Sequence, residues 1–157
     1  MKHGRENYPS YATLVLHEEA FRGPLYGPNI ADAFLVGTKV LLVDDDVYNL
    51  QALTIYLRLM GLDVEQAHDG FEALKQLDNS RFHVVVSDIR MPGLDGVELV
   101  KRIRHKLKGI PIVLISGDPT ATMEVIPRPE LLRVLTKPFM PSELLEIIHQ
   151  AVTDKEL

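Results

Sequence analysis

The stretch Val40-Leu41-Leu42-Val43-Asp44-Asp45-Asp46 decides the fold class of this chain. Four consecutive apolar residues end abruptly in three carboxylates, and residues 48–60 then show a helical pattern that stops at Gly61. A continuous apolar run of strand length is typical of a parallel strand that is covered on both faces. The stretch therefore predicts a strand–loop–helix unit with acidic side chains at the carboxyl end of its strand.

The alternation of strand and helix continues along the rest of the chain. Further strands are predicted at residues 63–67, 82–87, 110–115 and 132–135, and further helices at about residues 70–77, 96–107 and 142–152. This order predicts an α/β fold, a doubly wound five-stranded parallel sheet with helices on both faces. Before the last strand, Pro119, Pro127 and Pro129 restrict any helix to about residues 121–126, because proline blocks helix interiors.

Composition is that of an ordinary globular protein and excludes several classes of function. Of the 157 residues, 46% are hydrophobic and 25% are charged. The formal net charge of −5 argues against nucleic acid as a direct partner, and the absence of cysteine excludes disulfides, thiol catalysis and cysteine-ligated zinc. No apolar run approaches the ~18 residues of a membrane span, and the first residues lack the apolar stretch of a signal peptide. We therefore expect a cytoplasmic protein without membrane contacts.

Residues 1–37 differ from the rest of the chain in their turn-forming residues. They contain three prolines and four glycines, and they show no recognisable motif. The apolar run at residues 11–16 is too short for periodicity to distinguish a strand from a helix. We expect residues 1–37 to be an N-terminal extension, either a linker or a partly disordered segment, before a domain at residues 38–157.

Polar side chains follow the predicted strands at the points where the strands end. These are Asp44 and Asp45, then Asp88, Ser116 and Lys137. The carboxyl ends of parallel strands meet at one edge of the sheet, so these side chains are expected to lie together. Clustered carboxylates repel unless they bind a cation or take up protons, and an all-oxygen ligand set favours Mg²⁺. An aspartate can also act as a nucleophile that forms an aspartyl-phosphate, for which a lysine and a hydroxyl supply a fixed cation and a hydrogen bond.

At these residues the chain resembles the phosphoacceptor receiver domain of two-component response regulators. The matching segments are Val43-Asp44-Asp45, Ser87-Asp88-Ile89-Arg90-Met91-Pro92-Gly93-Leu94-Asp95-Gly96, Ile115-Ser116-Gly117 and Thr136-Lys137-Pro138-Phe139, together with residues 67–74. The match covers about residues 39–152. Each segment is weak alone, but four of them in order, each at a strand end, are specific. The resemblance implies the flavodoxin-like receiver fold.

The resemblance also implies a phosphoacceptor role for Asp88. This residue would take a phosphoryl group from a phosphohistidine of a sensor histidine kinase or a phosphotransfer protein. The domain would catalyse its own phosphorylation and dephosphorylation and would not be an enzyme with a separate substrate. Ser116 and Lys137 would contact the phosphoryl group, and Gly117 would leave room for the donor imidazole.

The resemblance further implies a metal site and a set of partners. Mg²⁺, with Mn²⁺ as an alternative ion, would be bound by Asp44, Asp45, Asp88 and the backbone carbonyl of Arg90. No DNA-binding segment is recognisable, and nothing after Val152 is long enough to be an output domain. Output is therefore expected through a downstream protein partner, through homodimerisation or through phosphoryl relay, in a stand-alone receiver or in part of a hybrid histidine kinase.

The chain departs from the family pattern at Val134, where receivers commonly have an aromatic residue that moves on activation. Arg90 and Asp118 flank the site, two residues after Asp88 and Ser116 respectively, and we hypothesise that they form an ion pair over it. The resemblance suggests a cis peptide bond between Lys137 and Pro138, whereas the general frequency of such bonds favours trans.

Two other functions fit parts of the sequence. Asp44-Asp45-Asp46 matches the Asp-x-Asp motif of phosphatases that resemble haloacid dehalogenases, with Asp44 as the nucleophile. However, Tyr48 stands where that class has Thr or Val, and no late acidic pair follows the lysine. A structural receiver that is never phosphorylated is the third alternative.

Several polar residues are expected to have ordinary structural roles. Asp46 should cap the first helix and Ser142 the last one, and Asp95-Gly96 should form a turn. The six histidines show no ligand spacing and are expected at or near the surface: His3, His17, His68, His83, His105 and His149.

Overall fold

Strands and helices alternate along the described part of the chain, as the sequence predicts. A computed structural model describes residues 35–118 and 129–154, so the predicted helix at 121–126 lies outside the described residues. The elements are β1 (Lys39–Val43), α3 (Val47–Leu59), β2 (Asp63–Ala67), α4 (Gly70–Asn79), β3 (Val84–Asp88), α5 (Gly96–Lys106), β4 (Ile112–Ser116), the 3₁₀ turn η2 (Pro129–Leu131), β5 (Leu132–Thr136) and α6 (Pro141–Thr153). None of the helices in the described ranges has the length and apolarity needed to span a bilayer.

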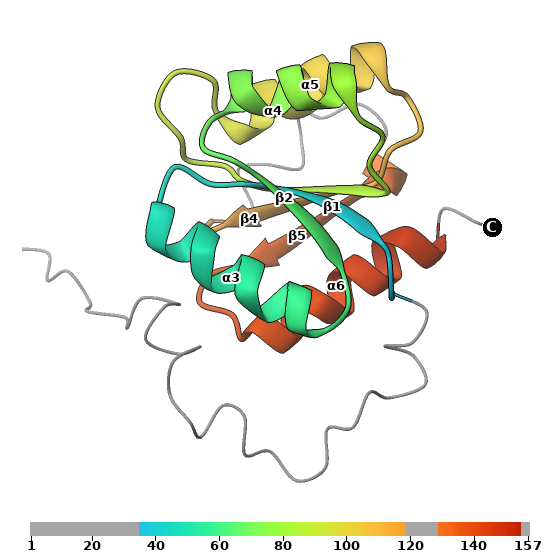
Figure 1. Ribbon diagram of the computed structural model, residues 1–157. Helices are drawn as coiled ribbons and strands as arrows, with labels where there is room; N and C mark the ends of the chain where they lie inside the picture. Colours follow the sequence, from blue (N-terminus) through green and yellow to red (C-terminus); the bar gives the residue numbers. More distant parts are fainter. Residues whose placement is uncertain (1–34, 119–128, 155–157) are drawn as a thin grey trace, which may run out of the picture.

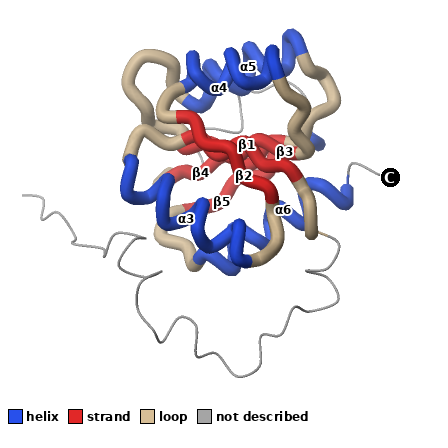
Figure 2. The backbone as a smooth tube through the Cα atoms, in the orientation of Figure 1, coloured by secondary structure: helices blue, strands red, loops and turns tan. Residues whose placement is uncertain are grey.

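The five strands form one parallel sheet in the order β2-β1-β3-β4-β5. Helices α4 and α5 cover one face of the sheet, and α3 and α6 cover the other (Figure 1). The tube view shows the same three layers, with the strands enclosed between the two pairs of helices (Figure 2). The predicted doubly wound parallel sheet with helices on both faces is therefore confirmed.

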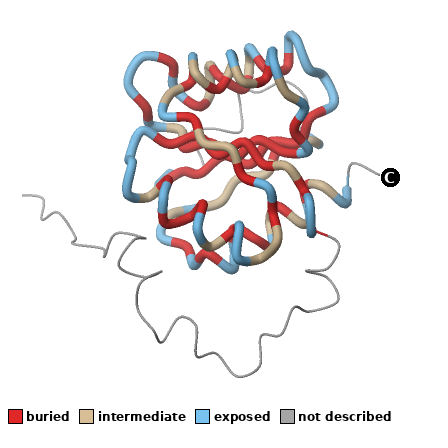
Figure 3. The backbone as a smooth tube through the Cα atoms, in the orientation of Figure 1, coloured by how far each residue is buried: buried red, intermediate tan, exposed pale blue. Residues whose placement is uncertain are grey.

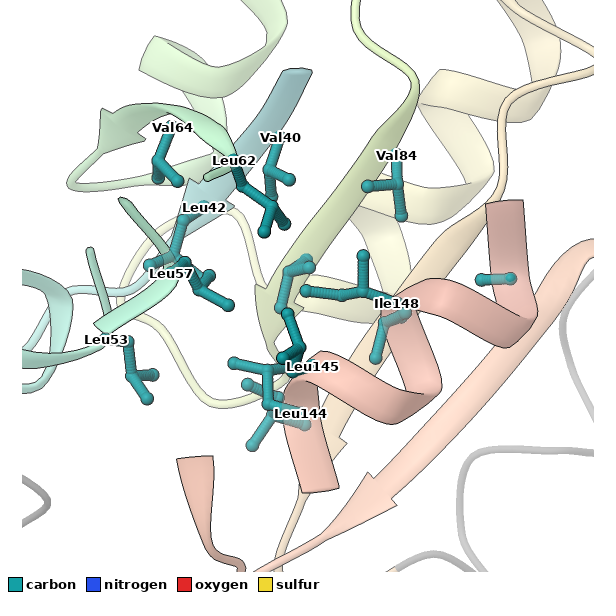
Figure 4. Close-up of a cluster of buried hydrophobic side chains, with 14 of the residues drawn as sticks. Val40, Leu42, Leu53, Leu57, Leu62, Val64, Val84, Leu144, Leu145 and Ile148 are labelled. Atoms are coloured by element: carbon teal, nitrogen blue, oxygen red, sulfur yellow. The ribbon is translucent and has the colours of Figure 1, made fainter. Parts of the chain in front are cut away.

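Burial on both faces explains why the strands are apolar without alternation. In β1, Val40 and Leu42 belong to the cluster beneath α3 and α6, whereas Leu41 and Val43 belong to the cluster beneath α4 and α5. Successive side chains of a strand point to opposite faces, so a strand between two helical layers needs an apolar residue at every position. Figure 3 shows the buried sheet between more exposed helices. Figure 4 shows the first cluster, in which Leu53 and Leu57 of α3 and Leu144 and Ile148 of α6 approach the strands.

The helix starts follow local hydrogen bonding and differ in two places from the prediction. Asp46 caps α3 as predicted, because its Oδ1 accepts the backbone N–H groups of Tyr48 and Asn49 at 2.9 and 3.1 Å. Asp95 is also a cap: its Oδ1 accepts the N–H of Glu98 at 2.8 Å. The predicted Asp95-Gly96 turn is therefore the N-terminus of α5, with Asp95 as its N-cap and Gly96 as its first residue.

The predicted cap of the last helix is wrong. Met140 precedes the helix, Pro141 is its first residue, and Ser142 lies inside the first turn. Proline at the first helical position has the required φ and lacks only an N–H that the helix does not use there. The side chain of Glu143 accepts the N–H of Met140 at 2.6 Å and so completes the start of α6.

Gly96 lets the start of α5 approach the backbone at the end of β3. Its N–H donates to the carbonyl of Ile89 at 2.8 Å. A Cβ at position 96 would lie 2.5 Å from the carbonyl oxygen of Asp88 and 2.7 Å from the Cα of Ile89. Both neighbours are backbone atoms, so neither can rotate away from an added Cβ. Helix α5 can start this close to Asp88 only because glycine has no side chain.

We expect Gly96→Ala to destabilise the protein by about 1–3 kcal/mol, the usual cost of overpacking. Gly109→Ala is the matched control, because a Cβ at that position meets nothing within 4 Å. Urea denaturation of both variants measures the difference. Equal unfolding midpoints would show that the approach of α5 tolerates a methyl group.

Candidate functional site

Three carboxylates converge at the carboxyl edge of the two central strands. Asp44 follows β1 directly, and Asp88 is the last residue of β3, the strand next to β1. Asp44, Asp45 and Asp88 each offer an oxygen within 4.8 Å of the other two. Asp44 and Asp88 are buried, with 5% and 7% of their surface exposed, while Asp45 is open to solvent. The structure therefore brings together the three carboxylates that the sequence singled out.

Burial perturbs the carboxyl group of Asp44. Removal from water raises the pKa of its carboxyl from 3.8 to about 6, and the negative charge of Asp88 acts in the same direction. The N–H of Asp46, which donates to Asp44 Oδ1 at 2.9 Å, opposes this shift. The cluster thus contains a buried negative charge that a bound cation or proton would stabilise.

Lys137 supplies the positive charge of the site, and it lies beside Asp88. Its Nζ is 3.1 Å from Asp88 Oδ1, and the same oxygen accepts the N–H of Ile89 at 3.0 Å. The backbone N–H of Lys137 donates to the carbonyl of Ser116 at 2.8 Å, which ties the end of β5 to the end of β4. The peptide bond between Lys137 and Pro138 is cis, as the resemblance suggested and against the general preference.

Ser116 lies at the same edge, but its hydroxyl is directed toward the loop after β4. The residue is buried at the end of β4, and Ile115 before it pairs with Asp88 across the sheet. Ser116 Oγ donates to the carbonyl of Asp118 at 2.8 Å and accepts the N–H of Asp118 at 3.0 Å. The hydroxyl of Ser116 therefore donates its hydrogen to the loop after β4 and not to a carboxylate of the cluster.

The remaining predicted positions flank the cluster. A Cβ at Gly117 meets nothing within 4 Å, so the glycine leaves open space beside Ser116. Arg90 is exposed, and the ion pairs found across residues 35–118 and 129–154 do not include the hypothesised pair with Asp118. Val134 is half-buried and packs against the cluster beneath α4 and α5.

The histidines that the structure describes do not belong to the acidic cluster. His68, His83 and His105 are exposed and His149 is half-buried, as expected for surface residues. His3 and His17 lie outside the described residues.

Sequence reasoning missed the groups that orient Asp88. The backbone N–H of Ile89 donates to its carboxylate, the side-chain Oγ of Ser87 donates to its carbonyl at 2.9 Å, and Gly96 packs against that carbonyl. The backbone N–H has no signature in the side-chain pattern. Only Gly96 had a visible signal, the Asp-Gly pair, and the prediction assigned it to an ordinary turn.

The ligand atoms of the cluster fit a hard divalent cation. All three side chains offer oxygen, which Mg²⁺ prefers, and Mg²⁺ usually takes one or two protein carboxylates together with waters. Asp45 faces solvent, so such an ion could keep part of its water shell. The charges also favour a bound cation, because the cluster holds three acids and Lys137, which contacts Asp88, contributes a single positive charge.

Comparison with known proteins identifies the family. The model of the response regulator receiver domain matches residues 40–149, most of the chain. The chain belongs to this family. Receiver domains act in phosphorylation-dependent two-component signalling and bind Mg²⁺ at this acidic pocket, and they are not classical enzymes.

Individual relatives agree with this assignment. The C4-dicarboxylate transport transcriptional regulatory protein DctD of Pseudomonas aeruginosa is 38% identical over 125 residues, covering 76% of this chain and 26% of the relative. The chemotaxis response regulator CheY4 of Vibrio cholerae matches with a TM-score of 0.67 and 32% identity, covering 74% of this chain and 99% of that one. The response regulator TrrA of Thermotoga maritima, solved in complex with Mg²⁺-BeF, matches with a TM-score of 0.65 and 28% identity, covering 73% and 98%.

The chain spans between 26% and 58% of the length of the first curated relatives that it matches. These relatives are named as transcriptional regulatory proteins. The likeness therefore concerns their receiver domains.

We expect Asp44→Asn to stabilise the metal-free protein at pH 7.5. The pKa of Asp44 is about 6 in the folded state, against the ordinary value of 3.8 that applies to the unfolded chain. At 1.36 kcal/mol per pKa unit, the free energy of unfolding therefore falls by up to about 3 kcal/mol as the pH rises through 6. Asparagine stays neutral and keeps the oxygen that accepts the N–H of Asp46. The gain should shrink toward pH 4, where the wild-type acid is protonated in the folded state.

Chemical denaturation in a chelating buffer at pH 7.5 and pH 4 measures this difference. Asp63→Asn is the control, because Asp63 is exposed and lies at the start of β2, away from the carboxyl edge of the sheet. This substitution should change the free energy of unfolding little. A destabilised Asp44→Asn at pH 7.5 would mean that burial does not penalise the Asp44 carboxylate.

Proposed function

We propose that Asp88 is the phosphoacceptor of this receiver and that the domain catalyses transfer of the phosphoryl group to it. The observation that carries the proposal is the contact of Lys137 Nζ with Asp88 Oδ1 at 3.1 Å, next to the two other carboxylates. A developing aspartyl-phosphate carries negative charge, and a fixed ammonium group beside the nucleophile neutralises it.

The same contact favours Asp88 over Asp44 as the nucleophile. The phosphatase alternative requires Asp44 to attack, but the lysine is paired with Asp88, and one Asp44 oxygen accepts the N–H of Asp46. Asp44 is better suited to holding a cation, with Asp45 and the backbone carbonyl of Arg90 as further ligands.

The proposed reaction transfers a phosphoryl group from a phosphohistidine. A carboxylate oxygen of Asp88 forms a bond to phosphorus as the bond from phosphorus to the imidazole nitrogen breaks, and the released electron pair stays on that nitrogen. Bound Mg²⁺ supplies positive charge to the phosphoryl oxygens. Lys137, which contacts Asp88, would add a second positive charge beside the phosphoryl group. Ser116 donates its hydroxyl hydrogen to a phosphoryl oxygen after leaving the carbonyl of Asp118.

We propose a sensor histidine kinase or phosphotransfer protein as the donor and a downstream protein or a second receiver as the recipient of the signal, within the cytoplasm. The net charge of −5 argues against nucleic acid as a direct partner. Several relatives are named as transcriptional regulators, so DNA contacts in a longer protein would belong to another part of the chain.

Intact mass after incubation with acetyl phosphate and Mg²⁺ tests the phosphoacceptor. The wild type should gain about 80 Da, one phosphoryl group, Asp88→Ala should gain nothing, and Asp44→Ala should gain less for want of a metal ligand. An adduct that persists in Asp88→Ala but vanishes in Asp44→Ala would support the phosphatase instead. No adduct from acetyl phosphate or from a phosphorylated histidine donor would support the structural alternative.

We expect Mg²⁺ to raise the melting temperature of the wild type, because a ligand at 100 times its Kd stabilises by about 2.7 kcal/mol. Asp45→Asn should remove most of this shift without affecting folding, since Asp45 is exposed. Asp63→Asn should keep it. Thermal unfolding with and without Mg²⁺ measures the effect, and an unchanged shift in Asp45→Asn would exclude that side chain as a ligand.

A further inference from the structure

Strand β2 lies at one edge of the sheet, so one of its sides has no neighbouring strand. An exposed edge presents backbone N–H and C=O groups to which a strand of another molecule can pair, and proteins usually block such edges. Proline and β-bulges are two common ways of blocking them. The five residues of β2 contain no proline and pair with β1 in continuous register, without a bulge. This edge therefore needs another form of protection.

The hydrogen bonds between β2 and β1 show which peptide groups of β2 point outward. The N–H of Asp63 donates to the carbonyl of Thr38 at 2.9 Å, and the carbonyl of Ala67 accepts an N–H from the residue after β1 at 3.1 Å. In a parallel pair, alternate residues of a strand bond to the neighbouring strand. The peptide groups of Val64 and Gln66 therefore point to the free edge.

Side chains from two helices bind both of these outward carbonyls. Arg58, near the end of α3, donates from Nη2 to the carbonyl of Val64 at 2.6 Å. Gln76, in α4, donates from Nε2 to the carbonyl of Gln66 at 2.6 Å. Helices α3 and α4 cover opposite faces of the sheet (Figure 1), so the donors reach the edge from both sides. We name Arg58 and Gln76 the edge guards.

The edge guards occupy the space that an added strand would need. A paired strand lies about 4.8 Å from its neighbour, and at this edge the guanidinium of Arg58 and the amide of Gln76 already contact the carbonyls. Gln66 ties the strand to α3 as well, because its Nε2 donates to Oγ1 of the buried Thr54 at 2.7 Å. Side chains of α3 and α4 thus satisfy the outward carbonyls within one molecule.

The residue between the two guarded carbonyls also opposes pairing between copies of the chain. In an antiparallel pair of two β2 strands centred on Glu65, Val64 of one copy would exchange hydrogen bonds with Gln66 of the other. The two Glu65 side chains would then lie directly opposite each other, and like charges in that arrangement are destabilising.

We propose that Arg58 and Gln76 close the β2 edge against strand addition and exclude a second copy of the chain from it. The closure follows from the free edge of β2, from the side-chain donors on both of its outward carbonyls and from the arrival of these donors from opposite faces of the sheet. It is independent of the phosphoacceptor role of Asp88, which lies in another strand.

Disulfide crosslinking between copies tests the closure, and the chain contains no native cysteine. The reporter is Glu65→Cys, because in an antiparallel pair centred on this residue the two Cα atoms would lie about 4.5 Å apart, within the range of a disulfide. The guard variant adds Arg58→Met and Gln76→Met, which remove both donors and keep long side chains. The control variant adds Arg102→Met and Gln150→Met, the same residue types at exposed positions of α5 and α6.

The guard variant should form intermolecular disulfides at least about tenfold faster than the control variant, the ratio that 1.4 kcal/mol of pairing free energy produces. Both proteins lack the ion pair of Glu65 with Lys39, so its loss cancels in the comparison. A second reporter, Glu146→Cys, is exposed on α6, which packs against β4 and β5. In place of Glu65→Cys, it should crosslink equally fast in the two backgrounds.

Each outcome of the crosslinking experiment decides the proposal. Equal rates for the guard and control variants with Glu65→Cys would overturn it. Acceleration with both reporters would also overturn it, because it would reflect a general loss of structure and not pairing at β2. Acceleration with the Glu65→Cys reporter alone supports the closure.

A conservative substitution separates the hydrogen bond from the bulk of the arginine side chain. In the Glu65→Cys protein, Arg58→Lys should crosslink more slowly than Arg58→Met, because lysine can still donate to the carbonyl of Val64. Urea denaturation of these two variants checks that both are folded. Equal crosslinking rates in the two folded variants would contradict the role given to the Arg58 hydrogen bond.

Discussion

The mutual repulsion of Asp44, Asp45 and Asp88 is the constraint on which the rest of the site depends. Their oxygens lie within 4.8 Å of one another, and two of the three residues are buried. Such a cluster persists only because the fold holds it and because Lys137 contacts Asp88. The rigid parallel sheet, with apolar residues on both faces, supplies the free energy that keeps like charges together.

The site therefore combines electrostatic strain with accurate positioning. Burial raises the pKa of Asp44, so the fold is less stable with this group ionised than it would be with a neutral residue. A cation bound at the cluster would offset this cost, because it neutralises the buried charge. Around Asp88 the positioning is done by backbone groups, the N–H of Ile89 and the close approach of Gly96, which side-chain substitution cannot supply.

Helix α3 connects the site with the surface. Its first turn is capped by Asp46, the third acid of the run that ends β1, so the helix begins where the cluster ends. Its inner side fills the core, and its outer side exposes apolar residues such as Tyr48 and Ile55 together with the polar Gln51 and Arg58. A single element thus links the acidic edge with the hydrophobic core, in which Leu35 is also buried.

The sequence by itself determined the strand–helix alternation, the parallel sheet and the identity of the residues at its carboxyl edge, because periodicity and apolar runs act over a few neighbouring residues. It also predicted the Asp46 cap, a local hydrogen bond, but it misplaced the start of α6, where Pro141 outweighs Ser142. Only the tertiary structure decided that Lys137 contacts Asp88 and that Ser116 turns toward Asp118. These features join residues far apart in the chain, and their geometry depends on strand register and packing, which no local pattern encodes.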